Sequence, residues 1–213
     1  ANMCKMPITL KRLITLRDEG LLEGKDWMHF LGTAQLDWSC YLTLIQREIK
    51  KHINENFTIS FDCASPFIAT AHGLVYTNAQ HTNKRWSVIM DKAPDTKALS
   101  GSDIPFPFES EVGSRLAMGD VCYYAPGMLN KIKKEGKTSW DSFSYALLMG
   151  HNVWTHLESV QRANQTFDAG AEWPYMMWNE SGDHARFADI VDAIFATTDR
   201  DESEAIIEHY DTY

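Results

Sequence analysis

The residue best placed to do chemistry in this sequence is Asp62, which follows an apolar run at residues 58–61 and precedes Cys63. The run is rich in β-branched and aromatic residues, which is typical of a buried strand. A carboxylate at the carboxyl end of such a strand can act as a nucleophile or as an acid or base, because the strand holds it rigidly. The same carboxylate can also turn or cap the chain. This motif by itself leaves both roles open.

A second short apolar run lies upstream at residues 27–31, ends at Gly32, and is followed by a helical pattern at residues 36–52. The order strand, helix, strand, with a spacing of about 30 residues, suits a right-handed parallel crossover. In parallel sheets, functional groups gather at the carboxyl ends of the strands. We therefore expect Gly32 and Asp62 at the same edge of one sheet.

Taken together, these motifs resemble the last two strand–helix units of the tRNA-guanine (queuine) transglycosylase family. The resemblance covers roughly residues 8–165 and is carried by Phe30-Leu31-Gly32, Phe61-Asp62-Cys63, Pro66, Gly73 and His151-Asn152. That family has a TIM-barrel fold. The resemblance implies an α/β chain with a partial TIM-barrel-like fold, made of the last βα units of a (β/α)8 barrel.

The resemblance also implies a reaction in which Asp62 is the nucleophile. Asp62 would attack the ribose C1′ of a nucleotide and expel its guanine, forming a covalent intermediate that a 7-deazaguanine-type base then resolves. A carboxylate suits this role because it can bond to an oxocarbenium-like centre and later leave it. Phe30, Leu31 and Gly32 would line the base by apolar contact and close backbone approach. No cofactor is expected.

Two departures from the family pattern concern the nucleic acid and the metal. Ile68 and Ala71 stand where the family has two arginines that grip the tRNA anticodon loop. We therefore expect a nucleic-acid partner, with DNA, as in phage-type relatives, or a non-standard RNA favoured over tRNA. Cys122 and His151 lack the neighbouring cysteines of the family's zinc site. Four-coordinate structural zinc needs four ligands, so we expect no metal.

A third departure is that the earlier strands of the barrel have no counterpart before residue 8. Two alternatives to an active enzyme therefore stay open. The chain can be a catalytically inactive structural or interaction protein derived from a transglycosylase barrel. It can also be a fragment that needs a second chain, or further copies of itself, to complete the barrel.

Composition excludes several classes of protein. The chain has 213 residues, of which 44% are hydrophobic, so it can bury a substantial core. Its four cysteines show no disulfide framework, and it has no long apolar run or signal-peptide pattern. We expect a cytoplasmic protein that does not enter membranes.

The charge of −9 is concentrated at the C-terminal end, so the body of the chain is close to neutral. Within that body, Lys131, Lys133, Lys134 and Lys137 form a basic cluster that can contact phosphates, or that is only a solvated loop.

The chain is expected to divide near residue 165. Residues 1–165 form the transglycosylase-like barrel portion, with an irregular insertion at about residues 78–138. Residues 166–213 form an acidic, aromatic-rich helical extension, in which the apolar residues of 187–195 keep helical spacing. We expect this extension to dock on its own body, on an open sheet edge or on a partner chain.

Overall fold

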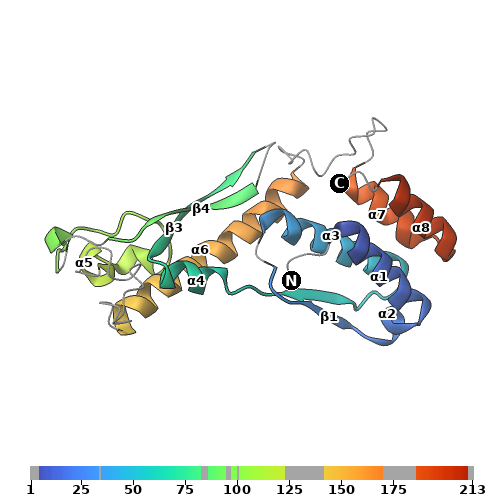
Figure 1. Ribbon diagram of the computed structural model, residues 1–213, viewed down its shortest axis with the longest axis horizontal. Coiled ribbons are helices and arrows are strands. Elements are labelled where there is room, and N and C mark those ends of the chain that lie inside the picture. The colour runs from blue at the N-terminus through green and yellow to red at the C-terminus, as the bar shows by residue number, and fades with distance from the viewer. Residues whose placement is uncertain are drawn as a thin grey trace, which may run out of the picture. The chain divides into compact units, whose positions relative to one another are not determined.

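The computed structural model describes residues 5–33, 35–82, 86–94, 97–99, 101–122, 142–169 and 186–210 (Figure 1). The chain is a mixed α/β protein that divides into two compact units. The first unit contains Ala1–Cys63, His81–Trp86 and Ala163–Tyr213, and the second contains Ala64–Gln80 and Ser87–Arg162. Among the described residues, no helix combines the length and apolar character needed to cross a lipid bilayer.

The first unit contains the expected parallel crossover. Strands β1 (Trp27–Phe30) and β2 (Thr58–Phe61) pair in parallel, and helix α3 (Leu36–His52) connects them. Trp27 lies opposite Thr58, and the register continues to Phe30 opposite Phe61. The strand–helix–strand prediction is therefore confirmed. The (β/α)8 barrel stays a prediction, because each sheet in the described part of the chain has two strands.

The two faces of the β1–β2 pair differ in character, because side chains alternate along a strand. Met28 and Ile59 are partly buried and pack against the core of the unit. Trp27, by contrast, is 63% exposed on the other face. Helix α3 also contributes to the edge of β2, since the Ile59 backbone N–H donates to Gln46 Oε1 at 2.6 Å. The sheet therefore has one face in the core and one face open.

The remaining helices of this unit are α1 (Met6–Asp18), the short α2 (Leu21–Gly24), α7 (Phe187–Ala196) and α8 (Arg200–His209). Helix α7 packs on α3, and α8 packs on α1 and α7 (Figure 1). Their shared core is apolar and consists of Leu10, Leu13, Ile14, Leu22, Ile45, Ile49, Phe57, Ile190, Val191, Ile194, Phe195 and Ile207. The amphipathic C-terminal helices therefore bury their apolar faces on the N-terminal helices of the same unit.

A buried arginine reinforces this packing. The Arg17 side chain is only 8% exposed, and its Nη1 donates to the carbonyl oxygens of Ile194 at 3.4 Å and Thr197 at 2.7 Å. The same nitrogen donates to Ser203 Oγ at 3.1 Å. Carbonyl groups at a helix C-terminus lack partners within the helix and carry partial negative charge. Arg17 therefore supplies the missing donors at the end of α7 and ties α1 to the turn before α8.

The elements between residues 65 and 168 are α4 (Ser65–Ala71), β3 (Leu74–His81), β4 (Trp86–Lys92), 3-10 turns at Lys97–Leu99 and Gly113–Arg115, α5 (Met118–Val121) and α6 (Ser142–Asp168). Strands β3 and β4 form a second two-stranded sheet. Ala93 N donates to Gly73 O, and Thr77 Oγ1 donates to Ile89 O, so the two strands run antiparallel. Helix α6, with 27 residues, carries His151 and Asn152.

Polar side chains of α6 join it to β3 inside the second unit. Asn152 is fully buried and accepts a hydrogen bond from Tyr76 N at 2.8 Å. Its Nδ2 donates to Thr70 Oγ1 at 2.9 Å and to the Leu74 carbonyl at 3.0 Å. One amide thus uses its acceptor and both donors to bind α4 and β3, as buried polar groups must.

Candidate functional site

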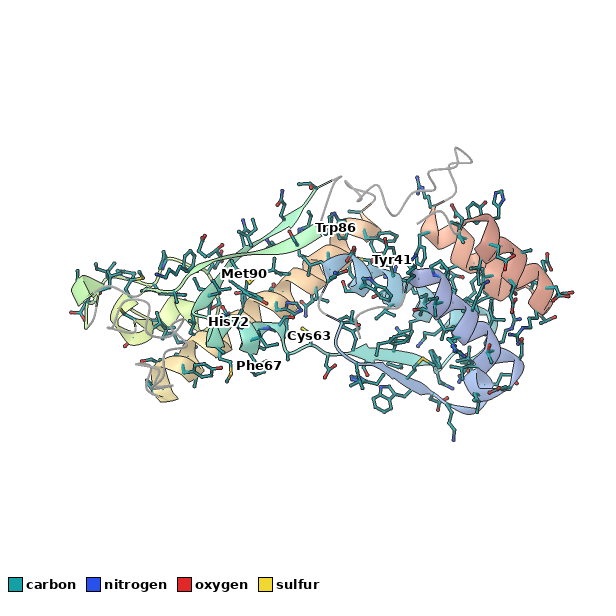
Figure 2. The ribbon with its side chains drawn as sticks, viewed as in Figure 1. Tyr41, Cys63, Phe67, His72, Trp86 and Met90 are labelled. Atoms are coloured by element: carbon teal, nitrogen blue, oxygen red, sulfur yellow. The ribbon has the colours of Figure 1, made fainter. Side chains whose placement is uncertain are left out.

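Asp62 lies directly after β2, next to the turn that follows β1. Its side chain is 60% exposed, and its Oδ1 accepts a hydrogen bond from Gly32 N at 3.0 Å. Gly32 has a φ of +72°. Few residues other than glycine adopt this backbone conformation without strain, so the turn requires glycine at this position. The ends of the two strands therefore meet, as the parallel crossover predicts. Figure 2 labels Cys63, the residue after Asp62.

His29 is the second titratable group at this edge. Its Nε2 lies 3.6 Å from Asp62 Oδ1, and its ring is 28% exposed. Its Nδ1 lies 2.8 Å from Ser60 Oγ, which also accepts a hydrogen bond from Trp27 Nε1 at 2.8 Å. The indole and imidazole rings lie side by side, with centroids 5.8 Å apart. Trp27, Ser60, His29 and Asp62 thus form one continuous polar chain across the open face.

The proton positions in this chain follow from the chemistry of its members. An indole N–H only donates, so Ser60 Oγ must accept from Trp27. Ser60 then either donates to Nδ1 of a neutral His29 or accepts from Nδ1–H with its other lone pair. Nδ1 is occupied in both cases. The nitrogen that faces Asp62, Nε2, is therefore the one available to exchange a proton.

Sequence reasoning missed His29, Ser60 and Trp27. The signal that could have found them is the alternation of side chains along a strand. Residues 27, 29 and 31 share one face of the first strand, and residues 58, 60 and 62 share one face of the second. The parallel register then sets His29 opposite Ser60.

The three predicted base-lining residues lie on different sides of the sheet. Gly32 contacts Asp62, and Leu31 is 68% exposed between Phe30 and Gly32. Phe30 is partly buried and, by alternation, shares the face of Met28 rather than that of His29. Gly32 and Leu31 are thus near the carboxylate, whereas Phe30 belongs to the core-facing side of β1.

Four lysines were predicted to contact nucleic acid, and two other positions were predicted to lack the basic grip of the family. The cluster Lys131, Lys133, Lys134 and Lys137 lies outside the residues that the structure describes. Ile68 and Ala71 are described, and both lie on α4 with exposed side chains. These two positions offer no charge to a phosphate.

One group in the described part of the chain has donor atoms that could hold a metal ion. Glu48, His52 and Asp192 place their ligand atoms within 4.8 Å of one another. Lys51 Nζ, however, lies 2.7 Å from Asp192 Oδ1 and 3.6 Å from Glu48 Oε2. Lys51 and then His52 hold the pKa of Asp192 well below its usual range, while burial and then Asp192 raise the pKa of Glu48. The group is an ion-pair network between α3 and α7, in which Lys51 already contacts both carboxylates.

The two residues considered for a zinc site have other roles. Cys122 is buried. His151 is fully buried, with Nδ1 at 2.7 Å from Ser110 Oγ and Nε2 at 2.8 Å from the Tyr76 carbonyl. Burial lowers the pKa of His151, which keeps the ring neutral. Both ring nitrogens are therefore engaged in hydrogen bonds within the fold.

Comparison with known proteins gives no further assignment. No family model matches the chain, no curated protein matches it, and no solved structure matches it. The chemistry of the site therefore rests on its own residues.

Proposed function

We propose that this protein exchanges a purine base in a nucleic acid, by a transglycosylase-like reaction with Asp62 as the covalent nucleophile. The outgoing base is guanine, and the incoming base is of the 7-deazaguanine type. The single observation that carries the proposal is the Asp62 carboxylate itself, exposed at the carboxyl end of a parallel strand and held by the Gly32 N–H.

The bonding of Asp62 supports a nucleophilic role. Among the described residues, the carboxylate has two polar contacts, and both are made by Oδ1. They are with Gly32 N at 3.0 Å and with His29 Nε2 at 3.6 Å. This arrangement fixes the carboxylate while Oδ2 stays free to bond to an electrophilic carbon. A fixed nucleophile saves much of the entropy of bringing two reactants together. The carboxylate can then leave again when the second base arrives, which divides one displacement into two easier steps.

The uncharged side chains on α4 support a nucleic acid other than tRNA. The exposed side chains of Ile68 and Ala71 give no basic grip where the family holds the tRNA anticodon loop. Phosphate contacts supply most of the affinity for a nucleic acid, so their loss at this point weakens tRNA binding in particular. We therefore propose DNA, or an RNA other than tRNA, as the substrate.

The test combines base exchange with trapping of the intermediate. Guanine-containing DNA and RNA oligonucleotides are incubated with labelled guanine, and incorporation is measured together with a covalent complex on denaturing gels. Asp62→Asn should abolish both signals, because the amide is a much weaker nucleophile. Asp26→Asn is the matched control, since Asp26 is an exposed carboxylate beside the opposite end of β1. Exchange at the wild-type rate by the Asp62 variant would refute the proposal.

A second candidate function is favoured by the open face of the sheet. Trp27, at the start of β1, is 63% exposed, and Leu31, directly after the end of β1, is 68% exposed. Large exposed apolar side chains that lie together often mark an interaction site. In this alternative the chain is an interaction protein that has no catalysis of its own and pairs its strands with a second chain or copy. A wild-type protein that exchanges no base, yet co-purifies with a partner that Trp27→Glu releases, would favour it.

A further inference from the structure

We propose that His29 is the residue that gives a proton to the departing base and takes one from the incoming base, with Ser60 and Trp27 positioning its ring. This inference rests on the proposed role of Asp62. It concerns the second half of the chemistry, since the nitrogen of a leaving purine carries away an electron pair and must be protonated.

His29 and Asp62 are close together, and their side chains suit the two roles. His29 is a titratable side chain in close contact with the Asp62 carboxylate, with Nε2 at 3.6 Å from Oδ1. Double-displacement glycosidases likewise hold their two catalytic groups close together, about 5 to 5.5 Å apart. Histidine is also the side chain that gains and loses a proton most readily near neutral pH. The pair therefore has the composition and the closeness that a double displacement at a sugar carbon needs.

The orientation of the ring is set by Ser60 and Trp27. Ser60 Oγ holds Nδ1 at 2.8 Å, and Trp27 Nε1 in turn holds Ser60 Oγ at 2.8 Å. These contacts leave the other nitrogen, Nε2, directed toward Asp62 and the open face. A nucleophile, a base and a third group that orients the base form the usual signature of covalent catalysis.

The reaction proceeds in two half-reactions, and protons and electrons balance in each. In the first half-reaction, a bond forms between Asp62 Oδ2 and C1′, and the bond between C1′ and the base nitrogen breaks. The electron pair stays on that nitrogen, which takes the Nε2 proton of the His29 imidazolium. The neutral ring keeps its Nδ1–H, which donates to Ser60 Oγ. In the second half-reaction the incoming base gives its N–H proton to Nε2, attacks C1′, and Asp62 leaves as a carboxylate.

The experiment compares two substrates that differ in their need for a proton. Guanine in an oligonucleotide is a poor leaving group, whereas p-nitrophenolate leaves p-nitrophenyl ribofuranoside without protonation. General acid catalysis contributes on the order of 10²- to 10⁴-fold in rate. His29→Gln should therefore slow base exchange by about 10²-fold or more and leave nitrophenolate release near the wild-type rate. His72→Gln, which removes an exposed histidine at the end of α4, is the control and should change neither rate.

A loss by His29→Gln of equal size on both substrates would overturn the inference, since a purely structural role affects them alike. Failure of the proposed function gives a different pattern, in which Asp62→Asn retains both rates. An activity-independent readout is the ¹⁵N spectrum of His29. In the neutral wild-type ring the proton should lie on Nδ1, which donates to Ser60 Oγ, and Ser60→Ala should give a mixture of both tautomers. A wild-type mixture that Ser60→Ala does not change would also overturn it.

Discussion

Replacing Asn152 by leucine tests the polar connection between α6 and β3. The substitution keeps the number and branching of side-chain heavy atoms but removes the acceptor for Tyr76 N and the donors to Thr70 Oγ1 and the Leu74 carbonyl. Thr70 keeps its own bond to the Pro66 carbonyl at 2.9 Å. The cost therefore comes mainly from the two backbone groups, each worth about 1 to 3 kcal/mol when it is buried without a partner. We expect a loss of about 2 to 6 kcal/mol in the free energy of unfolding, a large part of the 5 to 15 kcal/mol that is typical of a domain.

Urea unfolding followed by circular dichroism measures this loss, and hydrogen exchange at the Tyr76 amide localises it. Gln161→Leu is the control, because Gln161 is an exposed polar residue on the same helix. If Asn152→Leu does not fold, Asn152→Asp can replace it, since a carboxylate still accepts from Tyr76 N but cannot donate to the Leu74 carbonyl. A free energy of unfolding within about 0.5 kcal/mol of wild type, the range of ordinary surface substitutions, together with unchanged protection of Tyr76, would refute the reasoning.

Three further predictions concern buried groups. Burial lowers the pKa of His151, so its contribution to stability is complete above the ordinary value of 6.5 and is lost as pH falls through the lowered value. Midpoints of urea unfolding at pH 7.5 and 5.5 should show this loss, and His151→Gln should remove that part of the pH dependence. Burial raises the pKa of Cys40 to about 12, so little of its reactive thiolate is present. Iodoacetamide should therefore label the partly exposed Cys63 in the native protein but label Cys40 only after unfolding. Equal labelling of the two cysteines in the native protein would contradict this. Ile14 is fully buried in the core of the first unit, and Ile14→Ala should cost about 2 to 5 kcal/mol by urea unfolding, whereas a cost below about 1 kcal/mol would mean that the site collapses or is not in the core.

The elements that sequence reasoning predicted well are those with a strong local pattern. Helix α3 begins at Leu36 and ends at His52, the limits expected from its apolar face, and the parallel pairing of β1 with β2 follows from the spacing around it. The docking of the C-terminal helices on α1 and α3 was left open, because an amphipathic pattern shows which face is buried but not what covers it. Arg17 illustrates the difficulty, since its partners at Ile194 and Thr197 lie far away in the sequence.

Sequence reasoning predicted some residues of the candidate site and missed others. Asp62 and Gly32 were found because a strand end and a glycine turn are both visible in sequence. His29 and Ser60 were missed because neither belongs to a motif, and their meeting depends on the register between two strands. Phe30 was placed at the site through the resemblance alone, and the alternation of side chains along β1 sets it on the other face.

The exposure of the site sets what it can achieve. Asp62 is 60% exposed, and charges in water interact weakly, at about 1 kcal/mol for two unit charges 4 Å apart, against about 4 kcal/mol at an effective dielectric constant near 20. A second chain or copy that covers Trp27 and Leu31 would bury their apolar surface. The same contact would exclude water from Asp62 and His29. If base exchange and association both occur as proposed, they are coupled, because the same contact supplies binding energy and strengthens the electrostatics of the site. A charged side chain introduced by Trp27→Glu should accordingly weaken association and base exchange together, whereas loss of association with unchanged exchange would show that the covering chain is not needed.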